Sequence, residues 1–299
     1  MRLLRSLPGL VLPTALVAAN LNIDHVTVAG RKLDEMRKAF TAATSVPTEY
    51  GGPHSNHATE MALVSFPDGS YLELMGLQPK ADPVAVSMHV WSGFLEHDGG
   101  PCAFALRVSN IGAEIRGLKA AGITAGMPED SGRTRPDGVK LVWQTVNVGP
   151  GNRGSLFPFL ISDRTPREYR AYPAGKPTTD RFRGVAEVVI GVHDIEAAVA
   201  QYRKAFQLPA PSRQEDVKFG ASLAWFEGTP IVLAQGLGSE SWLSRRVHEY
   251  GDAPCAFVLK SNSGGLNARP TLGTWFGKQV VWMDAAALGW RLGLEPAKP

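Results

Sequence analysis

The tetrapeptide Arg-Lys-Ala-Phe stands at residues 37–40 and recurs at 203–206, and Pro-Cys-Ala-Phe stands at residues 101–104 and recurs at 254–257. A third match lies between them in the same order, with Phe66 and Gly76-Leu77 answered by Phe226 and Gly236-Leu237. Three matches in one order indicate a duplicated unit. Residues common to both copies are expected to be architectural, and polar residues found in only one copy are candidates for chemistry.

The composition is that of a globular protein with about two domains and a sizeable core. The chain has 299 residues, of which 44% are hydrophobic and 20% charged, and its net charge is +3. Lysines and arginines are scattered rather than clustered among aromatic residues, so we expect no nucleic-acid partner. No window of about 18 apolar residues exists, so we expect no membrane span.

The first 19 residues differ from the rest of the chain. Arg2 and Arg5 precede a largely apolar stretch, residues 7–19, which ends in the small residues Ala18 and Ala19. This pattern is typical of a secretory signal peptide. We therefore expect a secreted or periplasmic protein, and a cytoplasmic one if the segment is only an N-terminal extension.

Hydrophobic periodicity predicts strands interrupted by single helices, which is an α+β fold. In the first copy we expect strands at 22–28, 59–66, 70–77, 102–109, 139–148 and 154–162, a loop at 47–57, and helices at 32–43, 82–97 and 110–121. In the second copy we expect strands at 184–191, 217–226, 230–236, 254–260 and within 270–295, and helices from Asp194 and at 240–250. The last unit is expected to be degenerate, because residues 261–267 stand where its helix would be and do not have a helical pattern. The predicted domains are residues 20–165 and 184–299, joined by a linker at 166–183.

Two polar side chains of the first copy are expected to share one face of its sheet. Because side chains alternate along a strand, the residues facing the helix should be Val26, Val28, Leu72 and Leu74. The opposite face should then carry Ile23, His25, Thr27, Tyr71, Glu73 and Met75. An imidazole and a carboxylate inside a trough suit a divalent metal such as Zn, Fe, Mn or Ni. The same pair also suits a hydrogen-bonded couple in a metal-free pocket.

The residues Asp24-His25-Val26, the helix that follows, and the strand Tyr71-Leu72-Glu73-Leu74 resemble the glyoxalase/bleomycin-resistance/dioxygenase (vicinal oxygen chelate) superfamily, in its glyoxalase-like domain branch. The resemblance covers nearly the whole chain from Asn22 onward. It implies tandem βαβββ modules paired into two cup-shaped mixed sheets. It also implies that His25 and Glu73 are metal ligands, with Glu73 as the catalytic group.

The chain departs from the superfamily pattern in the partner module. Its first strand, at 102–108, contains no His, Asp or Glu, and its last, at 156–160, is likewise apolar, although a further ligand is expected there. A third ligand would have to come from His54, His57, Glu60 or His97, or from water.

The remaining candidates concern the ligand and the core. The residues expected to bind a small-molecule substrate are His57, Glu60, Tyr71, Trp143 and Phe159. Cys102 and Cys255 occupy matching positions and are expected to be buried core residues rather than a disulfide. The tryptophans of the second copy are expected to form its core. The oligomeric state stays open between a monomer and a homodimer.

Three functions remain open. The first is a metal-assisted lyase or isomerase acting on a small oxygen-rich molecule in the first copy. The second is a metal-free binding protein of the bleomycin-resistance type. The third and least favoured is an extradiol-type dioxygenase, because the second copy has Glu187 and Leu233 where His25 and Glu73 would be.

Overall fold

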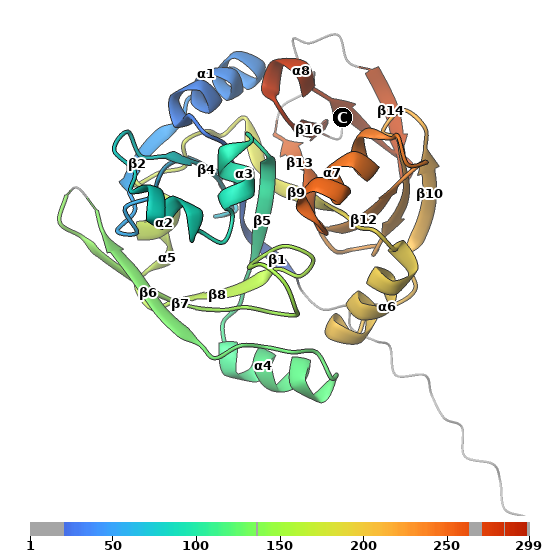
Figure 1. The fold of residues 1–299 in the computed structure, drawn as a ribbon, viewed down its shortest axis with the longest axis horizontal. Helices are drawn as coiled ribbons and strands as arrows, with labels where there is room; N and C mark the ends of the chain where they lie inside the picture. The colour runs from blue at the N-terminus through green and yellow to red at the C-terminus, as the bar shows by residue number, and fades with distance from the viewer. Residues whose placement is uncertain (1–20, 136, 263–270, 284, 298–299) are drawn as a thin grey trace, which may run out of the picture.

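The computed structural model describes residues 21–135, 137–262, 271–283 and 285–297. They form two curled eight-stranded mixed sheets that lie side by side, with helices around them (Figure 1). The two sheets have the same strand order, β2-β3-β4-β1-β5-β8-β7-β6 in the first and β10-β11-β12-β9-β13-β16-β15-β14 in the second. The predicted α+β fold with two cup-shaped mixed sheets is confirmed.

The first sheet is built from two modules of identical element order. The elements are β1 (Asn22–Ala29), α1 (Leu33–Thr44), β2 (Glu49–Pro53), β3 (Thr59–Ser65), β4 (Tyr71–Leu77), α2 (Pro83–Ser87), α3 (Ser92–Glu96), β5 (Gly100–Arg107), α4 (Ile111–Ala120), β6 (Glu129–Thr134), β7 (Lys140–Val146), β8 (Phe159–Asp163) and α5 (Arg167–Ala171). Strand β1 pairs parallel with β4 and antiparallel with β5, so the modules join along their first strands.

The second sheet repeats this plan. Its elements are β9 (Phe182–Gly191), α6 (Ile195–Phe206), β10 (Ser212–Asp216), β11 (Ala221–Trp225), β12 (Ile231–Gly236), α7 (Trp242–Tyr250), β13 (Ala253–Ser261), β14 (Thr271–Trp275), β15 (Lys278–Trp282), α8 (Ala285–Leu288) and β16 (Arg291–Glu295). Strand β9 again pairs parallel with β12 and antiparallel with β13. The stretch 261–267, predicted to replace a helix, lies mostly outside the described residues.

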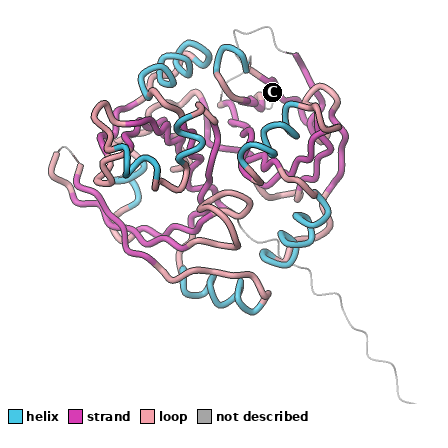
Figure 2. Tube along the Cα trace, in the orientation of Figure 1, coloured by secondary structure: helices cyan, strands magenta, loops and turns pink. Residues whose placement is uncertain are grey.

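Most of the elements that the sequence did not predict are short and polar. Strands β2, β6 and β10 lie at the outer positions of their sheets, where half-exposed residues carry no apolar alternation. The helix predicted at 82–97 is divided into α2 and α3, which are separated by residues 88–91 (Figure 2). The segment predicted as a linker, 166–183, contains α5.

One apolar core lies between the two sheets and unites them. It contains Phe40 of α1, Phe104 of β5, Tyr202 of α6 and Phe257 of β13, all fully buried. The buried Tyr202 hydroxyl donates to the Leu156 carbonyl, 2.6 Å away in the first half of the chain. Both copies of the repeated motifs therefore contribute to this core, as expected of architectural residues.

The two cysteines are free and buried. Burial raises the pKa of the Cys255 thiol to about 12 and holds that of Cys102 well above its ordinary value. Neither thiol should react with Ellman's reagent in the native protein at pH 8, because the thiolate is the reactive species. We expect both to react after unfolding in guanidinium chloride, and fast reaction of either one without denaturant would contradict this packing.

The predicted signal peptide, residues 1–19, lies outside the described residues, so secretion stays a prediction. In the described part of the chain, no helix is both long enough and apolar enough to cross a membrane.

Candidate functional site

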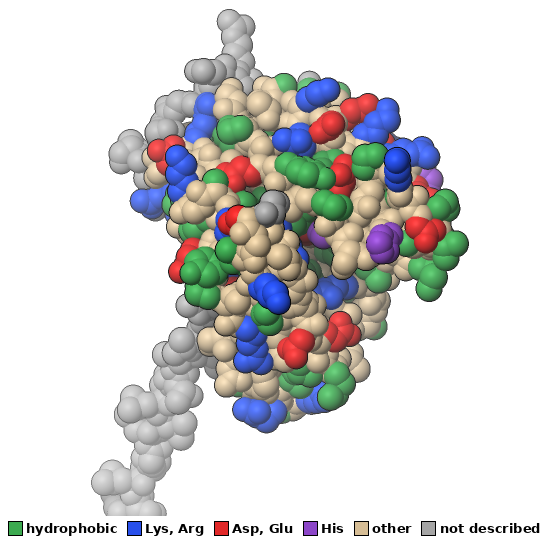
Figure 3. All heavy atoms as spheres, turned by 90° about the vertical axis from the view of Figure 1, so that its left-hand side faces the viewer, with side chains coloured by type: hydrophobic (Ala, Val, Ile, Leu, Met, Phe, Trp, Pro, Cys, Tyr) green, Lys and Arg blue, Asp and Glu red, His purple; other side chains and the backbone are tan. Residues whose placement is uncertain are grey.

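The first sheet encloses a cavity of about 840 Å³. Strands β1, β3, β4, β6, β7 and β8 contribute to its wall, together with residues 53–57, residues 89–91, Arg153 and Arg170 of α5. Figure 3 faces this side of the molecule and shows a hollow with histidine and basic side chains beside it. Its volume lies in the range of sites that hold organic ligands of moderate size.

His25 and Glu73 both line this cavity. Parallel pairing places His25 beside Tyr71 and Thr27 beside Glu73. The Nε2 atom of His25 lies 4.0 Å from Oε2 of Glu73. The Thr27 hydroxyl donates to the same Oε2 over 3.0 Å, which fixes one carboxylate oxygen. The predicted face of β4, with Tyr71, Glu73 and Met75 turned inward, agrees with the cavity lining.

The predicted face of β1 is wrong at one residue. Ile23 belongs to the core between the sheets with Val26 and Val28, not to the face of His25. The register of β1 against β5 shifts between Ile23 and His25, and such an irregularity interrupts strict alternation. As a result, the neighbouring Asp24 is turned toward the histidine that it precedes.

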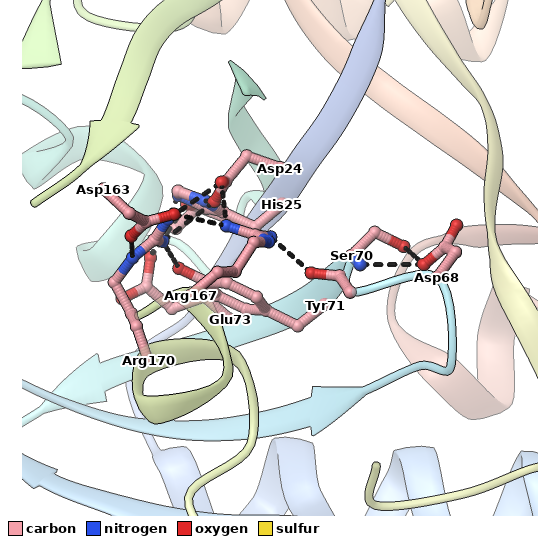
Figure 4. A network of polar contacts seen from close by, with 11 residues as sticks. Asp24, His25, Asp68, Ser70, Tyr71, Glu73, Asp163, Arg167 and Arg170 are labelled. Carbon is pink, nitrogen blue, oxygen red and sulfur yellow. Dashed lines mark hydrogen bonds and ion pairs between the residues drawn. The ribbon is translucent and has the colours of Figure 1, made fainter. Parts of the chain in front are cut away.

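Asp24 ties His25 to α5 (Figure 4). The Nδ1–H of His25 donates to Asp24 Oδ1 over 2.6 Å, and Arg170 donates to both Asp24 oxygens over 2.9 Å. Arg170 also pairs with Asp163, and Arg167 pairs with both carboxylates. This network fixes the imidazole through its Nδ1 side, so that in the neutral ring Nε2 carries the lone pair.

The charge state of this network follows from its contacts. Burial alone would raise the pKa of Asp24, but the charge of Arg170, with hydrogen bonds from His25 and Arg170, holds that pKa well below its ordinary value. Burial alone would lower the pKa of Arg170, but Asp24 holds it well above its ordinary value. The pair is therefore ionised although both side chains are almost entirely buried.

Two aromatic rings hold the imidazole from either side. The Tyr71 ring is stacked on His25, with centroids 4.8 Å apart and planes 9° apart. Phe159 meets the same ring edge-on at 5.4 Å. The Tyr71 hydroxyl accepts a hydrogen bond from Arg170, and burial raises the pKa of Tyr71 above its ordinary value. Tyr71 is therefore uncharged, and its ring packs against His25 and fixes the orientation of the imidazole.

The loop between β2 and β3 brings further histidines to the cavity. His54 Nε2 lies 3.7 Å from Glu73 Oε1, and the ring is fixed by a 2.8 Å contact between Nδ1 and the Thr59 hydroxyl. His57 of the same loop also lines the cavity. His89, between α2 and α3, lines it too, although the sequence analysis did not identify this residue as a candidate. Burial, followed by the charge of His54, lowers the pKa of His89, which keeps its imidazole neutral at neutral pH.

The structure places the other predicted residues as follows. Trp143 and Phe159 line the cavity beside His57 and Tyr71. Glu60 is absent from the lining, because it precedes Met61 on β3 and neighbouring side chains of a strand point to opposite faces; Met61 points into the cavity. The Glu60 carboxylate accepts a hydrogen bond from the exposed Tyr50. His97 ends α3 on the surface, with Nδ1 3.0 Å from the Gly93 carbonyl. Glu60 and His97 therefore both lie outside the lining of the cavity that contains Glu73.

Three arginines of the cavity lining were missed by sequence reasoning. Arg133 lies on the edge strand β6, Arg153 in the loop before β8, and Arg170 on the predicted linker. Each lies among polar or glycine-rich residues with no periodicity, so no local signal distinguished these arginines from surface arginines. Only the curling of the sheet brings them to His25 and Glu73.

The donors around Glu73 have the right chemistry for a divalent metal but do not converge on one point. Two imidazoles and one carboxylate are a ligand set that Fe, Zn or Mn accepts. A tetrahedral ion with bonds of about 2.1 Å separates its ligand atoms by roughly 3.4 Å. The observed separations from Glu73 are 4.0 and 3.7 Å. Among the described residues no three such side chains form a cluster that holds a metal.

The second sheet replaces these groups. Glu187, at the position of His25, accepts hydrogen bonds from Trp275 and Lys278 over 2.6 and 2.7 Å. The prediction that Leu233 corresponds to Glu73 is wrong, because Leu233 faces the core between the sheets. The residue that corresponds to Glu73 is the buried Val232. Val232 pairs with Val189 of β9 in the same way as Glu73 pairs with Thr27 of β1.

Aromatic rings occupy the inner side of this second sheet. They are Phe219, Trp242, Trp275 and Trp282, and the ring of Phe219 lies between 4.8 and 5.3 Å from the other three. The prediction that the tryptophans form core holds for Trp275, which is fully buried here, and for Trp290, which packs in the core between the sheets. The polar constellation of His25 and Glu73 is therefore found in the first sheet and not at the equivalent positions of the second.

Paired βαβββ modules with a histidine and a glutamate inside the curled sheet define a protein of the vicinal oxygen chelate class. The sequence profile of the family described as "Glyoxalase-like domain" matches residues 23–206, more than half of the chain. The chain belongs to this family. Comparison with the curated proteins gives no match.

Solved structures share the fold at low sequence identity. A hypothetical protein from Staphylococcus aureus is 15% identical, with a TM-score of 0.63 over 93% of this chain and 100% of that one. A mutant of 4-hydroxymandelate synthase from Streptomyces coelicolor is 14% identical, with a TM-score of 0.55 over 82% of this chain and 72% of that one. Both likenesses concern the fold alone.

Proposed function

We propose that this protein is an enzyme of the lyase or isomerase type that moves a proton within a small oxygen-rich molecule bound in the cavity of the first sheet. The observation that carries the proposal is the position of Glu73. Its carboxylate lies 3.7 to 4.0 Å from two imidazole Nε2 atoms inside a large cavity, and the second sheet has Glu187 and Val232 at the positions of His25 and Glu73.

Glu73 is the group that accepts the proton. Its Oε2 is held by the Thr27 hydroxyl, whereas Oε1 has the imidazole of His54 beside it. A C–H bond next to a substrate carbonyl breaks, its proton passes to Glu73, and its electron pair shifts toward the carbonyl oxygen. Return of the proton to another atom completes an isomerisation, and loss of a leaving group completes an elimination.

His25 positions the substrate oxygens. Asp24 holds its Nδ1, and Tyr71 and Phe159 fix the plane of its ring, so that Nε2 is directed toward Glu73. A divalent metal held by His25, Glu73 and His54 would stabilise the charge that develops on a carbonyl oxygen. A shift of less than about 1 Å would bring the measured separations to those that such an ion requires.

Solvent deuterium exchange tests this proposal. A panel of 2-oxo and 2-hydroxy carboxylic acids is incubated with the protein and Zn, Mn, Fe(II) or Ni in D₂O, and C–H signals are followed by proton NMR. We expect exchange at the carbon next to the carbonyl for at least one compound. Glu73→Gln should reduce the rate at least about 100-fold, because the proton acceptor is removed.

Glu60→Gln is the matched control, since it removes a carboxylate of the neighbouring strand that lies outside the cavity lining. It should exchange as fast as the unaltered protein. Equal loss in both variants, or exchange that is insensitive to Glu73→Gln, would rule out Glu73 as the proton acceptor.

A metal-free binding protein is the second candidate. It is favoured by the fact that His25, His54 and Glu73 do not converge into a metal cluster among the described residues. Tight ligand binding in the presence of EDTA, with no deuterium exchange under any metal, would support this candidate over the enzyme.

A further inference from the structure

We infer that the ligand of this cavity is an organic anion, whose carboxylate or phosphate is bound by the guanidinium groups of Arg133 and Arg153. The inference deepens the proposed function and depends on it only in taking the same cavity as the site. It concerns binding, so it can be tested without turnover.

Arg153 is held in the cavity wall without an acidic partner. Among the described residues no carboxylate lies within ion-pair distance of it, and its guanidinium stands over the Phe159 ring at 4.3 Å. Its backbone is fixed, because its carbonyl accepts from Trp91 over 3.1 Å and the next residue, Gly154, is pressed against β5. Gly154 has φ of 72°, and a Cβ there would lie 2.8 Å from the Ala103 side chain.

Arg133 uses few of its donors within the part of the chain that the structure describes. It comes from β6, and its Nη1 donates to the Gly51 carbonyl of β2 over 3.0 Å. No ion pair with it is found in the described ranges, and a guanidinium has five N–H donors. Strands β2 and β6 are the two ends of the first sheet, so this hydrogen bond spans the opening of the cup.

Both guanidinium groups are partly desolvated, which is costly without a counter-charge. Burial lowers the pKa of Arg133 and of Arg153, whereas nearby acidic groups, Glu73 among them, raise it. The groups still carry their charge at neutral pH. An anionic ligand would compensate them directly, since charge-assisted hydrogen bonds to carboxylate and phosphate are among the strongest in proteins.

Other charges of the lining do not provide that compensation. The described lining contains three arginines and one carboxylate, Glu73. Arg170 is already neutralised by Asp24 and Asp163, which leaves Arg133 and Arg153 against Glu73. The cavity therefore has an excess of positive charge before a ligand enters.

The rest of the wall indicates that this anion has an apolar body. Trp91, Trp143, Tyr71 and Phe159 line the same cavity of about 840 Å³. Aromatic walls with a few directed polar groups are typical of sites for organic ligands rather than for inorganic ions. A ring or a chain packed on these residues would place its acidic group beside the arginines.

Matched probes test the charge requirement. Naphthalene-2-carboxylate, 2-naphthyl phosphate and naphthalene-2-carboxamide have the same apolar body, and only the first two are anions. Calorimetric titration of the full chain in EDTA should give at least about tenfold tighter binding of an anion than of the amide. The better anion distinguishes a carboxylate site from a phosphate site. An amide that binds as tightly, or no binding of any probe, would overturn the inference.

Variants assign the charge to its residues. Arg153→Gln and Arg133→Gln should each weaken the preferred anion about tenfold and leave the amide unchanged. Arg153→Lys should retain part of the affinity, and Arg116→Gln, an exposed change on α4, should retain all of it. Anion binding that is unaffected by both cavity variants would overturn the assignment. Because EDTA is present and no turnover is measured, failure of deuterium exchange would leave this result unchanged.

Discussion

Changing His25 to alanine is expected to abolish stoichiometric retention of a divalent metal and to lower proton exchange at least about 100-fold. The imidazole supplies one of the donors beside Glu73, and its loss leaves Asp24 without the ring that it orients. Changes in groups that merely support a ligand already cost about 10- to 100-fold in metal affinity or activity, so loss of the ligand should cost more. Elemental analysis of metal-loaded, gel-filtered protein measures the first effect.

His193→Ala provides the control for this variant. His193 is an exposed histidine in the second half, and its Nδ1 lies 2.8 Å from Asp252. This variant should retain about one metal per chain, as the unaltered protein should. Equal metal content in the His25→Ala variant would refute metal binding at His25 and favour the metal-free binding protein.

Arg170→Met is expected to reduce the free energy of unfolding by about 3–5 kcal/mol, because it leaves the buried carboxylates of Asp24 and Asp163 undercompensated. Methionine keeps much of the side-chain volume, so the loss reports on charge rather than on a cavity. Urea unfolding monitored by tryptophan fluorescence gives the value. The exposed pair of Lys32 and Glu35 is the control, and Lys32→Met should change stability by less than about 1 kcal/mol.

The same variant should alter the pH dependence of stability. The pKa of Asp24 is lowered in the folded protein, so its stabilising contribution is complete above the ordinary value of about 3.9 and is lost only as the pH falls through the lowered value. Without Arg170, burial raises the pKa of Asp24, so the contribution of Asp24 to the free energy of unfolding is lost at a higher pH than in the unaltered protein. The stability deficit should therefore be largest near pH 7 and become smaller in strong acid. A deficit that is constant with pH would show that Asp24 is not the group responsible.

The sequence predicts the parts of the fold and the site that depend on regular periodicity. Alternation in β4 correctly placed Glu73 and Tyr71 on the inner face, and the repeats located the polar pair in the first copy. Alternation failed at Ile23, where the β1 register is irregular. Alignment of the two copies failed at Leu233, because the strand register shows that Val232, not Leu233, corresponds to Glu73.

The remainder of the site depends on contacts between distant segments. Arg170 reaches Asp24 across 146 positions of the chain, and Arg133 reaches Gly51 across 82. Such contacts arise from the closing of a sheet rather than from any local pattern. The edge strands that bring them there, β2 and β6, are also the elements with the weakest periodicity.

The bond from Arg133 to Gly51 has a consequence for the width of the entrance. The terminal strands of an open sheet are ordinarily free to diverge or to pair with another chain. Here the Arg133 side chain of β6 donates a hydrogen bond to the Gly51 carbonyl of β2, so the two terminal strands are connected across the opening. Arg133 thus limits the size of the ligand as well as supplying charge: a residue at position 133 too short to reach Gly51 would admit larger ligands and weaken the binding of anions, while a small neutral ligand such as the amide would bind as before.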